Sequence, residues 1–346
     1  MRALYFEEHG GIENLRVGER PDPEPGPGEV VIRLHAAALN HLDLFVLRGL
    51  PGIPVPLPHI GGADGAGVVA AVGEGVERVK EGDQVVFNPG IWCGQCEFCR
   101  KGEHSACVQY GIVGEHTDGT FAQFVKVKAE ACFPKPAHMG WEEAAAFPLT
   151  FLTAWRMLFT RARLQAGETV LIHGIGGGVA QAATLLARHA QAAVIVTSSD
   201  DTKLERAKAL GAQVTINYKK EDVARKVREL TAKRGVDVVV ETVGKATWMT
   251  SLRAAAKGGR IVTCGATTGP DPQEEIRLIF WNQLTILGST MGNQREFAEM
   301  LEWVGEHKIK PLVDKVFPLE DGAAAYRLLA AGEQFGKVVL TLGASA

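Results

Sequence analysis

The chain has 346 residues, more than one ordinary hydrophobic core supports, so we expect two domains. Lys and Arg number 37 and Asp and Glu 40, which gives a formal net charge of -3. That balance excludes the general basic surface with which proteins bind nucleic acid or an anionic membrane. The longest apolar run is too short to span a bilayer, and residues 1–8 lack the apolar core of a signal peptide. We therefore predict a cytoplasmic protein with a small-molecule substrate.

The first part of the chain has the pattern of a β domain. Short apolar runs at 30–34, 67–72 and 83–87 are separated by glycine and proline, as strands are. Residues 21–28 are so rich in proline that they predict a connector and exclude a helix. We predict a β-rich domain over residues 1–150.

Four of the six cysteines lie close together inside that domain. Cys93, Cys96, Cys99 and Cys107 have the spacing of a tetrahedral zinc site, within a lobe of about residues 88–110. Four protein ligands leave no position for water or substrate, so the pattern predicts one structural Zn²⁺ per chain. The alternative is four free or redox-active thiols.

From residue 151 the pattern changes to strands that alternate with helices. Apolar runs at 169–173, 193–197, 214–216, 236–241, 259–264 and 284–289 alternate with amphipathic segments at 202–210, 221–233 and 247–256. Such alternation predicts an α/β domain with a doubly wound parallel sheet, which we place at 151–295. The segment 296–346 returns to strand character around a helix at 319–331 and is expected to pack back on the first domain. Trp155, Trp248 and Trp281 are expected to be packing residues.

A glycine cluster follows the first of these strands and opens a helix. Glycines allow the backbone to approach a pyrophosphate, whose charge then faces the unpaired N–H groups of the helix. The predicted dinucleotide-binding turn consists of Gly174, Gly176, Gly177, Gly178, Val179 and Ala180.

The end of the second strand of this domain indicates which dinucleotide binds. NAD enzymes place an acidic residue there, whereas a small or basic residue admits a 2′-phosphate. The position falls on Ser198, with Lys203 as the nearest cation, so we predict NADP(H). A register shift of two would place Asp200 or Asp201 there and favour NAD(H).

Several motifs together resemble the medium-chain dehydrogenase/reductase superfamily, which includes zinc alcohol dehydrogenases and quinone oxidoreductases. They lie at 58–69, 93–107, 118–122, 164–170, 174–180 and 209–212. The resemblance covers the whole chain and implies a GroES-like β domain followed by a Rossmann domain. It also implies a homodimer or homotetramer, with residues 285–289 extending the sheet from edge to edge.

The same resemblance shows where this sequence departs from the zinc alcohol dehydrogenases. Their catalytic zinc is held by a cysteine, a histidine and a second cysteine. Here Asn40 and Ala63 occupy the first two positions, and no thiol is found near Leu149 or Thr150. Leu42 stands where those enzymes relay the alcohol proton through a hydroxyl. Asn40 instead matches the asparagine of the zinc-free quinone oxidoreductases.

Without a Lewis acid, an unactivated ketone is a poor hydride acceptor, whereas a conjugated acceptor needs only N–H donors at its oxygen. We therefore predict reduction of a quinone, an α,β-unsaturated carbonyl or an enoyl thioester. One alternative is an alcohol dehydrogenase whose zinc binds through residues such as His41, Asp64, His59 or His116. Another is a non-catalytic NADPH-binding regulatory module.

The resemblance also suggests roles for individual residues. Asn40 is the predicted catalytic residue, Asp43 its support, and His116 a proton donor unless it is a surface histidine bonded to backbone. His41 and Lys337 are predicted to contact the pyrophosphate. Residues expected to line or approach the nicotinamide are Thr153, Val243, Cys264, Gly265, Ala266, Ser289 and Thr290.

Overall fold

Apolar runs from both ends of the chain contribute to one sheet, while the middle of the chain builds another. The computed structural model describes residues 1–50 and 52–343. Met1–Leu149 and Gly292–Ala346 form one unit, here called the β-rich unit, and Thr150–Met291 form the second, the α/β unit.

The strands of the β-rich unit are short, and most are antiparallel. They are β1 Arg2–Phe6, β2 Arg16–Glu19, β3 Glu29–Ala38, β4 His59–Ile60, β5 Asp64–Val72, β6 Gln84–Phe87, β7 Gly90–Ile91, β8 Gly111–Ile112, β9 Phe124–Lys128, β10 Cys132–Pro134, β17 Val313–Pro318 and β18 Lys337–Thr341. Its helices are α1 His41–Arg48, α2 Glu97–Arg100, α3 Trp141–Ala145, α10 Gln294–Glu306 and α11 Gly322–Ala331.

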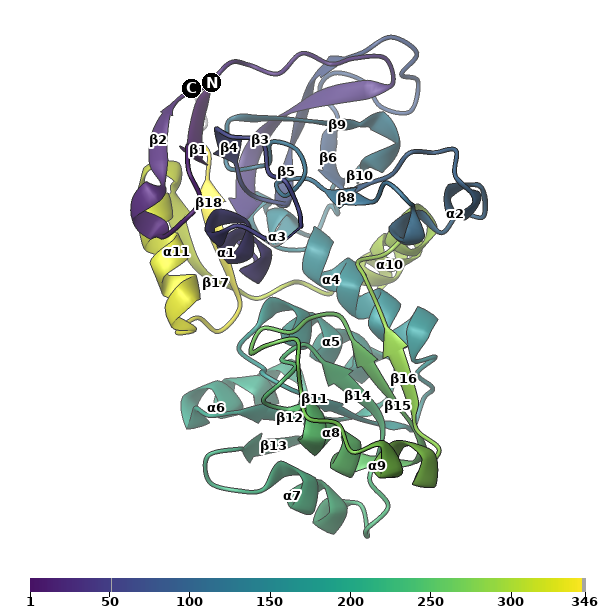
Figure 1. The fold of residues 1–346 in the computed structure, drawn as a ribbon. Coiled ribbons are helices and arrows are strands. Elements are labelled where there is room, and N and C mark those ends of the chain that lie inside the picture. Colours follow the sequence, from purple (N-terminus) through teal and green to yellow (C-terminus); the bar gives the residue numbers. More distant parts are fainter. Residues whose placement is uncertain (51, 344–346) are drawn as a thin grey trace. The chain divides into compact units, whose positions relative to one another are not determined.

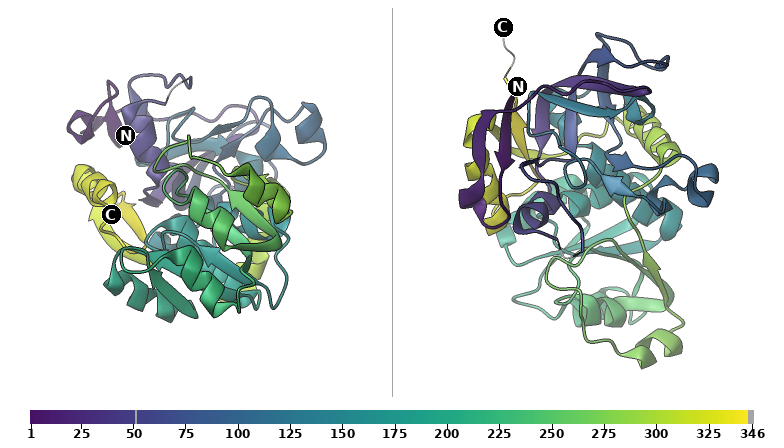
Figure 2. Two further views of the ribbon diagram at one scale, coloured as in Figure 1. Left: turned by 60° about the horizontal axis from the view of Figure 1, so that its bottom comes forward. Right: turned by 45° about the horizontal axis from the view of Figure 1, so that its top comes forward.

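The main sheet of this unit has the order β10-β6-β5-β3-β18-β17, with β9 also paired to β3. The C-terminal strand β18 runs antiparallel to β3, with Leu340 opposite Ala37. Figures 1 and 2 accordingly show the yellow C-terminal segment beside the purple N-terminal strands. Fully buried Phe6, Phe87, Phe121 and Tyr326 belong to the core beneath.

The α/β unit has a six-stranded parallel sheet in the order β13-β12-β11-β14-β15-β16 (Figure 1). Its strands are β11 Thr169–Ile172, β12 Ala193–Ser198, β13 Val214–Asn217, β14 Val236–Glu241, β15 Ala255–Thr263 and β16 Thr285–Gly288. Its helices are α5 Gly178–His189, α6 Asp201–Leu210, α7 Val223–Leu230, α8 Trp248–Ala254 and α9 Ile276–Trp281, and α4 Pro148–Trp155 crosses the unit boundary.

Consecutive residues of the central strands are buried, as in sheets covered on both faces. Val170, Leu171 and Ile172 of β11 and Val238, Val239 and Val240 of β14 are fully buried. The predicted fold class, a GroES-like β domain plus a doubly wound parallel sheet, is confirmed.

Some local predictions were wrong. The helix expected at 221–233 ends at Leu230, because Ala232 and Lys233 adopt positive φ angles of 49° and 67°. Trp281, expected to pack, is 73% exposed at the end of the short helix α9. In the described part of the chain, no helix combines the length and apolarity needed to cross a membrane.

Candidate active site

The four cysteines of the predicted zinc lobe converge. The Sγ atoms of Cys93, Cys96, Cys99 and Cys107 all lie within 4.8 Å of one another, and those of Cys93 and Cys99 are 3.9 Å apart. Four thiolates at Zn–S distances of about 2.3 Å have sulfur–sulfur separations of about 3.8 Å, so this group fits a tetrahedral Zn²⁺.

Backbone N–H groups donate to the sulfurs of Cys93, Cys96 and Cys107, whereas burial raises the pKa of the Cys99 thiol to about 12. Cys96 N donates to Cys93 Sγ at 3.4 Å, and Cys99 N donates to Cys96 Sγ at 3.5 Å. The Cys99 N–H is the main reason that the pKa of Cys96 is lowered to about 6. The donor set therefore suits a cation that binds thiolates.

In the α/β unit, the predicted cofactor residues gather along one edge of the sheet. The glycine turn lies between β11 and α5, Ser198 ends β12, and Val243 follows β14. Cys264 to Ala266 follow β15, and Ser289 and Thr290 follow β16. Because all these strands are parallel, their carboxyl ends share the edge at which open α/β sheets bind ligands.

The glycine turn has the backbone conformation that a phosphate-binding turn uses. Gly174 has a φ of 69°, in the left-handed region that glycine tolerates. Gly177 N donates to Gly174 O at 3.0 Å, and Gly177 caps α5 without a side chain. The first N–H groups of α5 therefore have no side-chain cap, and this terminus fits an anion.

The side chains at and after the end of β12 form hydrogen bonds or ion pairs with neighbouring residues. Ser198 Oγ accepts from Asp200 N at 3.1 Å, and Asp200 in turn caps α6 by accepting from Thr202 N and Lys203 N. Asp201 forms an ion pair with Lys220 and accepts from Asn217 Nδ2 at 2.7 Å. Both acidic side chains are therefore already bonded, and Ser198 is the residue that ends the strand.

Two residues near the end of the same edge differ in chemistry. Ser289 Oγ is buried and has no hydrogen-bond partner within the described residues, so it fits a polar ligand group. Burial raises the pKa of the Cys264 thiol to about 12, which makes it a neutral wall residue at neutral pH. Thr153, on α4, is buried, with its Oγ1 3.5 Å from Met291 Sδ.

In the β-rich unit, Asn40 belongs to a buried charged group here called the Lys337 cluster, which consists of Asn40, Asp64 and Lys337. Lys337 Nζ donates to Asn40 Oδ1 at 2.6 Å and to Asp64 Oδ2 at 2.9 Å. Asn40 Nδ2 also donates to Asp64 Oδ2 at 2.9 Å. Lys337 is 4% exposed and Asp64 fully buried. Sequence reasoning missed this pairing, because 273 residues separate the two charged residues.

The residues around this cluster do not fit a second zinc. An ammonium group lies against Asn40 and Asp64, and the other Asp64 oxygen accepts from Leu149 N at 2.7 Å. Among the described residues, the four-cysteine lobe is the one group of three or more potential ligands that converges. The expected alternative ligand set of His41, Asp64, His59 and His116 is not brought together.

Asp43 holds the turn that carries Asn40. Its Oδ2 accepts from Asn40 N at 2.6 Å, and its Oδ1 accepts from Gly62 N at 3.1 Å. Burial raises the pKa of this carboxyl to about 7, although both N–H groups act in the opposite direction. Asp43 is therefore bonded to the backbone N–H groups of Asn40 and Gly62, and its supporting role at the site stays a prediction.

The histidines of this unit have separate environments. His116 Nδ1 accepts from Ile112 N at 3.2 Å, which leaves Nε2 as its donor. His59 is buried with its Nε2 3.0 Å from Gly114 O, whereas His41 is exposed at the first position of α1. His116 thus has the backbone bond expected of a surface-loop histidine.

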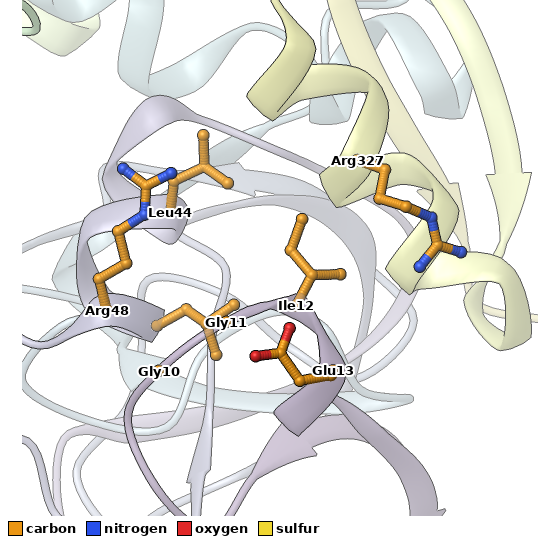
Figure 3. Close-up of a pocket in the computed structure, with 8 residues that line it drawn as sticks. Gly10, Gly11, Ile12, Glu13, Leu44, Arg48 and Arg327 are labelled. Atoms are coloured by element: carbon orange, nitrogen blue, oxygen red, sulfur yellow. The ribbon is translucent and has the colours of Figure 1, made fainter.

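The β-rich unit also contains a cavity of about 410 Å³ between the segment at Gly10–Glu13 and helices α1 and α11. Figure 3 shows Arg48 and Arg327 on opposite sides of it, with Glu13 nearby. None of the residues predicted for catalysis or cofactor binding lines this cavity.

Comparison with known proteins gives consistent matches along the chain. A model described as "Alcohol dehydrogenase GroES-like domain" matches residues 26–137, and one described as "Zinc-binding dehydrogenase" matches residues 178–306. A zinc-type alcohol dehydrogenase-like protein of Schizosaccharomyces pombe is 35% identical, with 99% of both chains covered.

Two further proteins differ in the activity that their names state. An acryloyl-coenzyme A reductase of Metallosphaera sedula is 32% identical and covers 99% of this chain and 100% of its own. The crystal structure of an NAD-dependent alcohol dehydrogenase is 47% identical, with a TM-score of 0.95 over 99% of this chain and 100% of that one.

Proposed function

Because the chain belongs to the medium-chain dehydrogenase/reductase superfamily and is an NAD(P)-dependent oxidoreductase, we propose that it reduces acceptors with a conjugated carbonyl. The acceptor classes are a quinone, an α,β-unsaturated carbonyl and an enoyl thioester. The Lys337 cluster carries this proposal, because a lysine ammonium binds both Asn40, at the first zinc-ligand position implied by the family resemblance, and Asp64, the residue that follows Ala63 at the second. The acryloyl-coenzyme A reductase among the relatives supports it.

The bound dinucleotide supplies the hydride in this reaction. Residues of the β-rich unit have the task of stabilising the negative charge that develops on the acceptor oxygen. One N–H of Asn40 Nδ2 donates to Asp64. The second N–H faces Ala38 O at 3.5 Å, which is a weak hydrogen bond, so this second N–H can be donated to a ligand instead. Lys337 uses two of its three N–H groups on Asn40 and Asp64. Asn40 is therefore the candidate donor to the oxyanion, and the remaining N–H of Lys337 is a second candidate; the pyrophosphate contact predicted for Lys337 stays an alternative use of that N–H.

The preferred dinucleotide is NADP(H), as the sequence predicts. Ser198 ends β12, and the neighbouring acidic side chains are bonded to the first turn of α6 and to Lys220. No carboxylate then competes with a 2′-phosphate at the strand end. The NAD-dependent relative makes a direct measurement necessary.

The cofactor assignment is tested by comparing the Kd values of NADPH and NADH for the native protein and Ser198→Asp. We expect the native protein to bind NADPH at least about 10-fold more tightly, and the variant to reverse that order, because a carboxylate repels the 2′-phosphate and accepts from ribose hydroxyls. Ser199→Asp, one residue further on, is the matched control. A native preference for NADH would contradict the assignment.

The metal content of the enzyme follows from the two donor sets. We propose one structural Zn²⁺ in the four-cysteine lobe and none at the Lys337 cluster. The thiols must stay reduced to bind it, which favours the cytoplasm. Metal analysis of the purified enzyme should give one zinc per chain. Two zincs, with activity lost on mild chelation, would support an alcohol dehydrogenase with unusual ligands.

The acceptor class is tested with NADPH and a panel of quinones, enones, enoyl thioesters, aldehydes and ketones. We expect kcat/KM for conjugated acceptors to exceed that for saturated ketones by at least about 100-fold, or about 2.7 kcal/mol of transition-state stabilisation. Equal activity on saturated ketones would refute the proposed acceptor class. No turnover of any acceptor would favour the regulatory module.

We also propose that the enzyme is a homodimer formed through β16, with the homotetramer as the alternative. β16 lies at the edge of the parallel sheet, and Thr285, Ile286 and Gly288 are exposed. Beside it in the sequence, Ile276, Phe280 and Trp281 of α9 are 65%, 62% and 73% exposed. An exposed edge strand and an apolar patch of this kind are features of self-association surfaces.

A further inference from the structure

Glu241 is a fully buried carboxylate at the end of β14 that the proposed reaction does not use. Its Oε1 accepts from Val243 N at 2.8 Å and from Gly244 N at 3.0 Å. Its Oε2 accepts from Ser251 Oγ at 2.6 Å, and Thr247 Oγ1 lies 2.8 Å from both oxygens. Two of these partners are backbone N–H groups, which only donate, and the other two are hydroxyls, so the set fits a carboxylate that accepts at both oxygens.

A carboxylate accepts hydrogen bonds and donates none, so it determines the direction of every bond behind it. Ser251 Oγ lies 2.6 Å from Glu241 Oε2 and 3.2 Å from Thr247 O, and the shorter contact with the carboxylate takes its hydrogen. Ser251 Oγ is then left to accept from His173 Nε2 at 3.1 Å. His173 is buried, and burial lowers its pKa, so the ring is neutral with its single proton on Nε2.

The bare Nδ1 of His173 must then accept a hydrogen bond. Thr197 Oγ1 lies 3.3 Å from Nδ1 and is its donor, while the same oxygen accepts from Gly174 N at 3.3 Å. The result is a chain of bonds in one direction, from the Gly174 N–H through Thr197, His173 and Ser251 to Glu241. Such chains strengthen each member by mutual polarisation.

The two ends of this chain lie at adjacent turns of the sheet. β11 and β14 pair in parallel, but their register ends at Ile172 opposite Val240, before either turn begins. A Cβ atom added to Gly174 would lie 3.7 Å from Val243 Cγ2, so the turns are in contact. Backbone pairing ends short of the turns, and the side-chain network continues the connection between them.

We propose that Glu241 is a positioning residue of the dinucleotide site, which fixes the glycine turn after β11 relative to the turn at Val243 and Gly244. This inference rests on the proposed binding of the dinucleotide at these turns. Glu241 acts through Ser251, His173 and Thr197, and does not itself contact the reacting atoms.

The test measures NADPH and NADH affinity of the full-length enzyme by fluorescence titration for the native protein, Glu241→Gln and Ser251→Ala. Glu241→Gln places an amide N–H against Ser251 Oγ, so Ser251 no longer donates to residue 241 and the ordered series of hydrogen bonds is broken there. We expect it to raise the dinucleotide Kd by at least about 10-fold, and Ser251→Ala by about 3-fold or more. At saturating dinucleotide, kcat should stay within about 2-fold of native, because the reacting groups are unchanged.

Val227→Ala is the matched control for lost stability, because Val227 is fully buried on α7 in the core of the same unit and is not a member of the hydrogen-bonded series. We expect it to lower Tm but leave the dinucleotide Kd within about 2-fold of native. Equal Kd increases in Val227→Ala and Glu241→Gln, or native affinity in Glu241→Gln, would overturn the proposal.

A second measurement detects the order of the hydrogen bonds through the tautomer of His173, and it needs neither cofactor nor activity. The ¹⁵N shifts of His173, assigned by their loss in His173→Gln, should show the Nε2–H tautomer in the native enzyme and a changed proton position in Glu241→Gln. A native Nδ1–H tautomer would refute the ordered chain. If the chain is present but the native enzyme binds neither dinucleotide, the proposed function has failed, and the positioning role fails with it.

Discussion

Asn40 and Lys337 illustrate how individual residues gain their roles from tertiary contacts. Each was expected to contact a ligand, and the structure joins them to Asp64 in one buried group. A buried ion pair is costly to break, because the remaining charge is left without a partner in a medium of low dielectric constant. We therefore expect the Lys337 cluster to contribute to folding of the β-rich unit as well as to the chemistry proposed there.

Lys337→Met tests this directly. Removal of the ammonium leaves the Asp64 carboxylate buried without a countercharge, which typically costs about 3–5 kcal/mol. We expect a large decrease in the urea midpoint of unfolding. The double variant Lys337→Met/Asp64→Asn should recover part of that loss, because it removes the unpaired charge. A double variant whose loss of unfolding free energy equals the sum of the losses in Lys337→Met and Asp64→Asn would show that the two residues are not coupled.

Asp43 leads to a prediction about pH. Its pKa is raised by burial from 3.8 to about 7, so between these values the folded protein binds a proton that the unfolded chain does not. Stability from this group is present below pH 4 and is lost as the pH rises toward 7. We expect Asp43→Asn to have a flatter dependence of unfolding free energy on pH over that interval, as urea titrations would measure. An unchanged slope would contradict the raised pKa.

At the scale of elements, the zinc lobe contains little regular structure. Its helix α2 has only four residues and its strand β7 only two, and the two-residue strand β8 follows directly after the lobe. Backbone N–H groups turn inward toward the sulfurs of Cys93, Cys96 and Cys107. Because the lobe has so little regular structure of its own, we expect the metal to contribute much of its folding free energy.

Replacement of one cysteine ligand should therefore unfold the lobe while the rest of the β-rich unit, which contains Asn40, stays folded. For Cys107→Ser we expect zinc content to fall from about one per chain to near zero and proteolysis to begin within residues 88–110. Metal analysis with limited proteolysis measures both. Cys132→Ser is the control, because Cys132 is buried outside the lobe. This variant should keep the zinc of the four-cysteine lobe. Full zinc retention in Cys107→Ser would refute the four-ligand site.

The six parallel strands show how elements collect a site from distant segments. The glycine turn, Ser198, Val243, Cys264 and Ser289 each follow a different strand. Their strand ends meet at one edge because every strand runs in the same direction. The motifs predict these positions as cofactor residues, and the common strand direction explains why all of them lie at one edge.

At the scale of the whole molecule, the chain leaves one unit and later returns to it. Strands β17 and β18, from its last part, extend the sheet begun by β3, and the α/β unit is a continuous insertion between them. The exposed edge strand β16 and the apolar residues of α9 belong to that insertion. We therefore expect subunit association to depend on the α/β unit.

The dimer prediction is tested with Ile286→Lys and Trp281→Glu. A charge at an edge strand or in an apolar interface opposes association, so both variants should shift the enzyme from dimer to monomer in light scattering coupled to gel filtration. Leu230→Glu is the control, because Leu230 is 47% exposed at the end of α7, away from β16 in the sheet order. If Ile286→Lys and Trp281→Glu remain dimers, as Leu230→Glu is expected to, β16 is not the dimer interface.

The sequence by itself determined the features that depend on local spacing. Strand and helix periodicity predicted the two sheets, four closely spaced cysteines predicted the zinc lobe, and the glycine turn predicted the dinucleotide site. Only the tertiary structure decided which charged side chains meet. Lys337 with Asp64, and Gly174 with Glu241 through His173, are joined across long stretches of chain. The physical reason is that a buried polar group needs a hydrogen-bond partner, and the fold brings that partner from a distant part of the sequence. Local periodicity does not specify which distant residue this is.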